Sequence, residues 1–339
     1  MKYKSILVAQ HGGPEVMQIV ENDLRWPAAR EVRIKVLAAS VSRPDVTVRR
    51  GEALYAGTPL AQKLPFTPGY AVIGDVDAVG VDARRAAVGE RVGVLTVTGG
   101  YTEMLYWRSD RLIPVPVGVE PAEAVTLILN YIVAYQTLHR SAKVKTGEMA
   151  LIIGASGGIG TALLQLGRLA DLKMYAIASK SKHSILTEYG ATPIDYHTQD
   201  FVDEIQRAEP DGLDVVLDGM MRLDYIRRSL PLLRRGGRMV SFGEPASLPE
   251  LFHILAIVAG VNLRPNGKSF KLYGTSTYFL GNRKPYLEDW TALFNLLEVG
   301  KIKPIIAAKF PILEAAKANE LLEGGQVTGN IVLLMPELL

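Results

Sequence analysis

The sequence contains no cysteine and only five histidines, and these shortages exclude several kinds of chemistry. Without cysteine the chain cannot form a disulfide, a thiolate nucleophile, an iron–sulfur cluster or a zinc site with cysteine ligands. The histidines are scattered, and no two stand four residues apart, the spacing that lets one helix face bind a metal. We therefore expect no metal site.

Long apolar runs and an excess of one charge are also missing. The most apolar run, residues 251–261, is far shorter than the roughly 20 residues that a membrane-spanning helix needs. Lys and Arg number 38 and Asp and Glu 35, a net charge of +3 that argues against nucleic acid as the main ligand. The first residues lack the apolar stretch of a signal peptide. We expect a cytoplasmic protein without a membrane span.

The 339 residues suffice for two domains, and the character of the chain changes twice. Up to about residue 120, short β-branched runs interrupted by Gly and Pro predict β structure. Apolar strands and helices then alternate, which is the rhythm of a doubly wound parallel sheet. After about residue 265 the pattern is mixed again. The last strand, at residues 330–335, has no partner near it in the sequence, so we expect it to join the first domain's sheet.

A glycine-rich turn at residues 154–160, between an apolar strand and an apolar helix, is the strongest signal in the sequence. Such glycines permit a tight turn and a close approach of the backbone to a pyrophosphate, and the helix N-terminus offers free N–H groups to the anion. Ala155 departs from the common G-x-G-x-x-G form. A glycine-rich connection without a ligand is the alternative, and we favour dinucleotide binding.

The end of the following strand predicts which dinucleotide binds. An NAD site places Asp or Glu there to accept hydrogen bonds from the ribose hydroxyls. In this chain Ser179, Lys180, Ser181 and Lys182 follow the strand, and hydroxyl and ammonium groups suit a 2′-phosphate. A solvated basic turn is the alternative, and we favour NADP(H).

Several short motifs, taken in order, resemble the zinc-independent branch of the medium-chain dehydrogenase/reductase superfamily, to which quinone oxidoreductases, the zeta-crystallin type and 2-enoyl reductases belong. They extend over nearly the whole chain, at residues 65–70, 88–92, 99–103, 134–138, 145–148, 154–160 and 233–238. The resemblance implies an α/β protein with a GroES-like, partly open β-barrel domain and a Rossmann domain. We expect the former to comprise residues 1–122 and 267–339 and the latter residues 123–266. A homodimer is expected too.

The resemblance also implies where a cofactor binds. Lys182 matches the 2′-phosphate lysine, Tyr196 its aromatic partner, and Asn130 the first residue of the family's Asn-x-x-Thr-Ala segment. Ser42 stands where the family has Asn, and Ala71 where zinc-containing relatives have Glu. The complete set of expected cofactor-binding residues is Ser42, Asn130, Ser156, Gly157, Gly158, Ile159, Ser179, Lys182, Tyr196, Phe242 and Gly243.

The activity implied is NADPH-dependent reduction of a quinone or of a C=C bond conjugated to a carbonyl. Reduction of such an alkene needs a hydride at the β-carbon and a proton at the α-carbon. Tyr55 resembles the acid of 2-enoyl thioester reductases, Tyr70 and Tyr278 compete with it, and solvent can protonate a reduced quinone. The alternatives are an NADPH-binding protein with little turnover, like crystallin-type or vesicle-associated relatives, and a zinc-free alcohol dehydrogenase.

Overall fold

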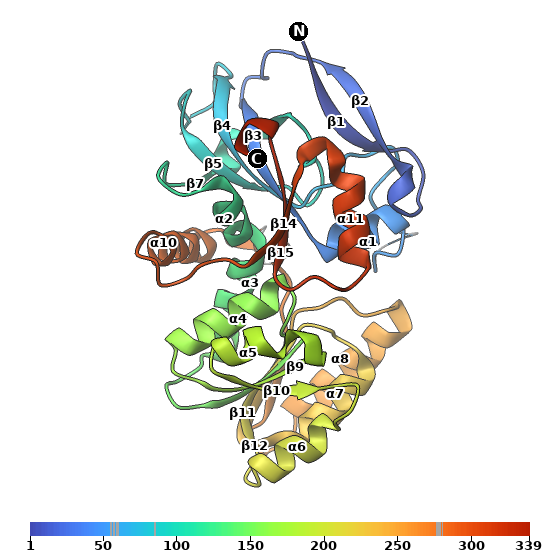
Figure 1. The fold of residues 1–339 in the computed structure, drawn as a ribbon, viewed down its shortest axis with the longest axis vertical. Helices are drawn as coiled ribbons and strands as arrows, with labels where there is room; N and C mark the ends of the chain where they lie inside the picture. Colours follow the sequence, from blue (N-terminus) through green and yellow to red (C-terminus); the bar gives the residue numbers. More distant parts are fainter. Residues whose placement is uncertain (55, 57, 59–60, 85, 276–278, 280) are drawn as a thin grey trace. The chain divides into compact units, whose positions relative to one another are not determined.

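The structure is a computed structural model that describes residues 1–54, 56, 58, 61–84, 86–275, 279 and 281–339 (Figure 1). The chain forms two units. One combines Met1–Leu129 with Lys284–Leu339, and the other is Asn130–Arg283. Each has its own hydrophobic core. The expected class, an α/β protein with a mainly β unit and a doubly wound unit, is confirmed.

The first unit is built on a seven-stranded sheet whose centre is β3 (Glu31–Val41). Its Val and Ile side chains alternate with polar ones over the first half, so one face of β3 is buried in the core. β3 pairs antiparallel with three strands, among them β15 (Asn330–Leu334). The expected return of the last strand to the first sheet is therefore confirmed. The other strands are β4 (Ala71–Val79), β5 (Arg91–Leu95), β6 (Met104–Arg108), β7 (Ile113–Pro114) and β14 (Ile306–Pro311), and a separate antiparallel pair consists of β1 (Lys2–Val8) and β2 (Met17–Asp23).

A buried ion pair connects the two chain segments of the first unit. Arg49, which is fully buried, donates to the Gly12 carbonyl and to the Glu323 carboxylate. In addition, the Trp290 indole donates to the Leu127 carbonyl over 3.1 Å. The helices involved are α1 (Arg43–Arg50), α2 (Pro121–Thr126), α10 (Lys284–Glu298) and α11 (Ala315–Glu323), and a π-helical turn, Leu127–Tyr131, follows α2.

The second unit contains a six-stranded parallel sheet in the order β10-β9-β8-β11-β12-β13. Numbered from β8, this is the 3-2-1-4-5-6 order of dinucleotide-binding Rossmann domains. Helices flank the sheet (Figure 1), and the apolar residues of its strands form the core of this unit. The strands are β8 (Met149–Ile153), β9 (Lys173–Ala178), β10 (Ala191–Asp195), β11 (Leu213–Asp218), β12 (Leu233–Ser241) and β13 (Ser269–Leu272). The helices are α3 (Ile132–Tyr135), α4 (Gly158–Leu169), α5 (His183–Glu188), α6 (Phe201–Ala208), α7 (Leu223–Ser229) and α8 (Leu248–Asn262), with a π-helical segment, Gln136–Ala142.

The unit boundaries differ from the sequence-based ones. β13 pairs in parallel with β12, with Arg238 opposite Ser269, so residues 267–283 belong to the second unit rather than to the first domain. Conversely, residues 123–129 belong to the first unit, because α2 contacts β3 and β4. The four-residue strand β13 follows a Pro- and Gly-containing turn, and such a turn predicts a domain boundary as readily as a loop within one sheet.

In the part of the chain that the structure describes, no helix is both long and apolar enough to cross a membrane.

Candidate functional site

The candidate site lies at the carboxyl ends of the parallel strands in the second unit. Strand order reverses between β8 and β11, and ligands of such sheets bind in the crevice at that point. Directly after β8 the chain turns through Gly154, whose φ of +80° is in the left-handed region that favours glycine. Gly157 is extended and begins helix α4.

Gly160 lets α4 lie directly against this turn. A Cβ atom at Gly160 would stand 2.3 Å from the Gly154 carbonyl oxygen and 2.5 Å from the carbonyl of Ala155. Real contacts are never that short, so any side chain at this position would push the helix away from the turn. The three-glycine arrangement therefore forms a cradle with no Cβ where a phosphate group would approach the backbone.

The start of α4 is free to bind an anion. The N–H groups of Gly158, Ile159 and Gly160 are the first of the helix and have no partner within it. Among the described residues no side chain caps this end, and the first turn carries no acidic residue. The helix is twelve residues long, and its N-terminus presents the partial positive charge of the helix dipole together with unpaired N–H donors.

The basic turn follows the neighbouring strand, β9. Ser179 and Ser181 place their hydroxyl oxygens 3.3 Å apart, and a 3₁₀ turn, Lys180–Lys182, leads into α5. Lys182 is half-buried, and burial lowers the pKa of its ammonium group, whereas Lys180 is exposed. An anion beside Lys182 would offset the loss of hydration that this side chain has undergone.

Tyr196 lies on the same edge, after β10, the strand next to β9. Its ring is 50% exposed and stands 4.1 Å from the His197 ring, centroid to centroid. Asp195 fixes this turn, because its carboxylate accepts the His197 N–H and the Thr198 hydroxyl, and these bonds hold its pKa below the usual range. An exposed aromatic face on a fixed turn is available for stacking.

The strand ends of β11 and β12 complete the edge around Asp218, which the sequence analysis did not identify. This buried carboxylate accepts the N–H groups of Met220 and Met221, at 2.9 and 3.1 Å, and the Ser241 hydroxyl at 2.7 Å. It thereby ties the turn after β11 to β12. An acidic residue directly after the apolar run Val215–Val216–Leu217 was the available signal.

Phe242 and Gly243 are held against that turn. A Cβ at Gly243 would lie 2.6 Å from the Gly219 carbonyl oxygen, and a Cβ at Gly219 would lie 2.9 Å from the Phe242 ring. A Cβ at Gly154 would stand 3.8 Å from the Met220 sulfur, so the turn reaches the glycine cradle. The structure thus brings together Ser156, Gly157, Gly158, Ile159, Ser179, Lys182, Tyr196, Phe242 and Gly243 at one end of one sheet.

The remaining expected residues are placed elsewhere or not described. Asn130 is buried in the π-helical turn at the beginning of the second unit. Tyr55 and Tyr278 lie outside the described residues, whereas Tyr70 is half-buried in the turn after Gly69.

Ser42 belongs to the first unit, where it begins α1 as its N-cap. Its hydroxyl and its N–H both donate to the Asp45 carboxylate, at 2.6 and 2.8 Å. The other carboxylate oxygen accepts the Gly69 N–H at 3.0 Å. The Ser42 proton is therefore engaged within the unit, and its oxygen keeps capacity to accept a bond from a ligand hydroxyl.

Comparison with known proteins agrees with this geometry. Family models match residues 28–117 as an alcohol dehydrogenase GroES-like domain and residues 189–333 as a zinc-binding dehydrogenase. Quinone oxidoreductase from Mus musculus is 30% identical, over 98% of each chain. The synaptic vesicle membrane protein VAT-1 homolog from Rattus norvegicus is 31% identical over 91% of this chain and 78% of its own length. This chain belongs to the zinc-independent quinone oxidoreductase family of medium-chain dehydrogenases/reductases.

Solved structures of family members have the same fold. The Escherichia coli quinone oxidoreductase complexed with NADPH gives a TM-score of 0.85 at 26% identity, over 98% of this chain and 99% of that one. The CurK enoyl reductase gives 0.84 at 26% identity with the same coverage. Although one family model is described as zinc-binding, the described residues of this member contain no group of three His, Cys, Asp or Glu that could hold a metal ion.

The buried Asp45 carboxyl, which accepts bonds from Ser42 and Gly69, predicts that the stability of this family member depends on pH. Burial raises the pKa of the Asp45 carboxyl from 3.8 to about 6, so between those values the folded chain holds a proton that the unfolded chain has released. This contribution to stability is complete below pH 4 and disappears as the pH rises through 6. A shift of this size corresponds to about 3 kcal/mol in the free energy of unfolding.

We expect the variant Asp45→Asn to be less stable than the parent and to lack this component of the pH dependence. Urea unfolding at several values between pH 4 and 7.5 measures it, with the exposed Asp82→Asn as control. Identical pH slopes for the parent and Asp45→Asn would contradict the assignment.

Proposed function

We propose that the chain is an NADPH-dependent, zinc-independent oxidoreductase that reduces a quinone or a C=C bond conjugated to a carbonyl. The observation that carries the proposal is the glycine cradle at the start of α4, next to a strand end with Lys and Ser in place of an acidic residue. Two names among the relatives support the acceptor class: quinone oxidoreductase and enoyl reductase. Membership of the family supports the oxidoreductase class as a whole.

The residues of the second unit fit a phosphorylated dinucleotide. Ser156, Gly157, Gly158 and Ile159 would hold the pyrophosphate with backbone N–H groups, since Gly160 leaves the approach to the turn open. Ser179 and Lys182 would bind the 2′-phosphate through a hydroxyl and a partly desolvated ammonium group. The Tyr196 ring would stack beside them on the adenine side.

Other residues would orient the reacting end. Phe242 follows the end of β12, and Gly243 leaves no Cβ next to the Met220 turn, which Asp218 fixes. Asn130 is polar, buried and suited to a hydrogen bond with the nicotinamide ribose. When bound, NADPH supplies a hydride, and the chain itself must then supply or admit a proton for an alkene substrate. We assign that proton donor to Tyr55.

We further propose a homodimer. Helix α8 has a single buried residue, and it exposes large apolar side chains: Leu248 at 45%, Phe252 at 67% and Leu255 at 44%. It packs next to β13, the last strand in the order of the described sheet. An exposed apolar helix face beside the terminal strand of a sheet is suited to packing against a second copy.

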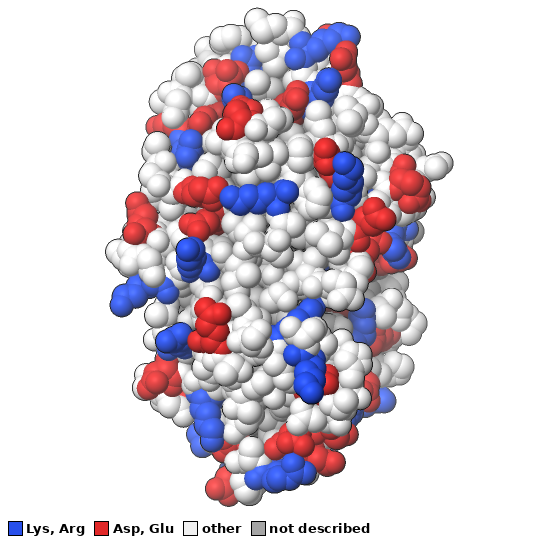
Figure 2. Space-filling model, in the orientation of Figure 1, with Lys and Arg blue, Asp and Glu red and all other residues white. Residues whose placement is uncertain are grey.

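A binding protein with little turnover is the second candidate, and the similarity to the VAT-1 homolog, whose name states no enzymatic activity, supports it. Both candidates share the cofactor site and differ in chemistry, so acceptor-dependent consumption of NADPH separates them. The charges on the face drawn in Figure 2, where Lys and Arg are interspersed with Asp and Glu, give no support to a polyanionic macromolecule as the ligand of that face.

The variant Lys182→Ala should weaken NADPH binding at least tenfold and NADH binding less than threefold, because one charge-assisted bond to a phosphate contributes about 1.5–3 kcal/mol. The exposed neighbour Lys180→Ala is the matched control, and cofactor fluorescence titration is the measurement. An equal loss for both cofactors would remove Lys182 from the phosphate site.

The variant Tyr55→Phe should lower kcat for an enone by 10²-fold or more, the usual contribution of a general acid, and leave quinone reduction nearly unchanged. Steady-state NADPH oxidation with both acceptors measures this, and Tyr70→Phe tests the competing tyrosine in the same assay. If enone reduction by Tyr55→Phe equals that of the parent, another group or water donates the proton.

A further inference from the structure

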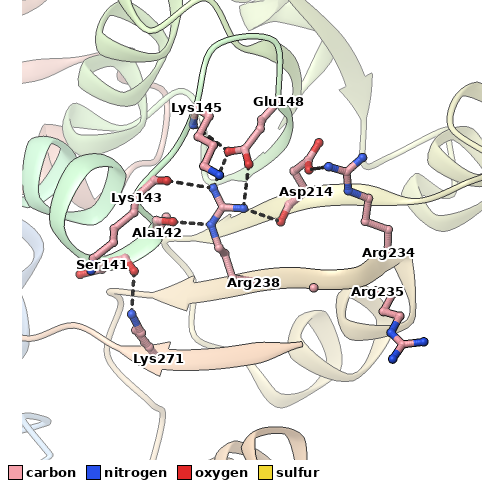
Figure 3. A pocket seen from close by; sticks show the side chains of 11 residues that line it. Ser141, Ala142, Lys143, Lys145, Glu148, Asp214, Arg234, Arg235, Arg238 and Lys271 are labelled. Atoms are coloured by element: carbon pink, nitrogen blue, oxygen red, sulfur yellow. Dashed lines mark hydrogen bonds and ion pairs between the residues drawn. The ribbon is translucent and has the colours of Figure 1, made fainter. Parts of the chain in front are cut away.

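A basic hollow lies at the amino ends of the strands in the second unit, away from the glycine cradle. It is open to solvent and has a volume of about 440 Å³, and Figure 3 shows the side chains that line it. Strand β8 separates the two places: Glu148, before β8, lines the hollow, whereas Gly154 follows β8. Five residues of strand span about 17 Å, so one ligand at each end would not overlap.

The hollow carries more positive charge than the chain as a whole. Its six cationic residues are Lys143, Lys145, Arg234, Arg235, Arg238 and Lys271, and its two acidic residues are Glu148 and Asp214. The lining therefore has a formal charge of +4, against +3 for all 339 residues. A concentration of like charge repels itself and attracts anions into the hollow.

Both carboxylates in the lining are already neutralised. Arg238 forms a bidentate ion pair with Glu148, and Arg234 pairs with Asp214 (Figure 3). The Asp214 carboxylate also accepts the Met149 N–H over 2.9 Å. No acidic group is thus left over to repel an incoming anion.

The carbonyl groups at the end of the π-helical segment Gln136–Ala142 also accept hydrogen bonds from cationic side chains. Arg238 donates to the carbonyls of Ala142 and Lys143, and Lys271 donates to that of Ser141 over 2.9 Å. These bonds offset the negative end of the helix dipole where it faces the hollow. The Ser141 carbonyl carries no net charge, so this bond brings no anion to Lys271.

Two lysines of the lining, Lys143 and Lys145, are exposed. In the part of the chain that the structure describes, neither ammonium group forms an ion pair, although the Lys145 N–H donates to the Glu148 carboxylate over 2.9 Å. The left-handed backbone of Lys143, with φ +51°, closes the helical segment and sets this lysine beside the hollow. Arg235 points away from the others (Figure 3), so we leave it out of the ligand set.

We propose that this hollow is a second anion site, which binds a compact phosphate-bearing anion of at least two negative charges through Lys143, Lys145 and Lys271. The lining contains no aromatic side chain and no apolar one larger than Ala, so it offers neither an aromatic ring for a nucleobase to stack on nor an apolar wall for an acyl chain. Ammonium groups that each provide several donors suit the oxygens of a phosphate. The proposal does not rest on the proposed function.

Inorganic pyrophosphate is the probe, titrated calorimetrically into the full chain at pH 7.5 and low salt, with excess NADP⁺ to fill the glycine cradle. The parent should bind one equivalent, and Lys143→Gln/Lys145→Gln should bind at least tenfold more weakly. The control Lys301→Gln/Lys303→Gln removes the same charge at the same spacing from exposed positions in the other unit, and it should stay within twofold of the parent.

Two outcomes would overturn the proposal: no binding of pyrophosphate by the parent in the presence of NADP⁺, or equal weakening in both double variants. Citrate provides a further arm, because binding as tight as that of pyrophosphate would show attraction by charge alone. If Lys143→Gln/Lys145→Gln does not fold, Lys271→Gln replaces it, with the same tenfold expectation.

Discussion

The contact between helix α4 and the turn before it is the constraint on which the rest of the site depends. The helix can lie against the Gly154 carbonyl only because Gly160 has no side chain. That contact aims the first N–H groups of the helix at the carboxyl edge of the sheet, where the ends of β9, β10, β11 and β12 supply the other groups. A helix displaced by a Cβ would move its donors away from all of them.

Two buried carboxylates do comparable work in the two units. Asp218 holds the turns after β11 and β12 together, and Asp45 holds the start of α1 and the Gly69 turn. Each is removed from water and surrounded by N–H and O–H donors, which is the condition under which a buried carboxylate is tolerated. In this family member, these buried carboxylates therefore fix the turns that carry candidate cofactor-binding residues.

Much of this arrangement was predictable because it is encoded locally. The turn at 154–160 and the basic residues after β9 lie between strongly apolar strands, so the sequence predicts their elements and their common edge. The return of β15 was predictable from its lack of a local partner. β13 was missed, because four residues after a turn carry little periodicity. Asp218 was missed, since only the sheet brings it to Met220 and Ser241.

The central claim is that the chain transfers a hydride from NADPH to an electrophilic acceptor. The most direct test is NADPH oxidation at 340 nm with a quinone, an enone, an enal and a 2-enoyl thioester, with NADH in parallel. The account predicts turnover of at least one of these acceptors and a preference for NADPH over NADH. Tight NADPH binding without turnover of any of the four, or an equal rate with NADH, would contradict it.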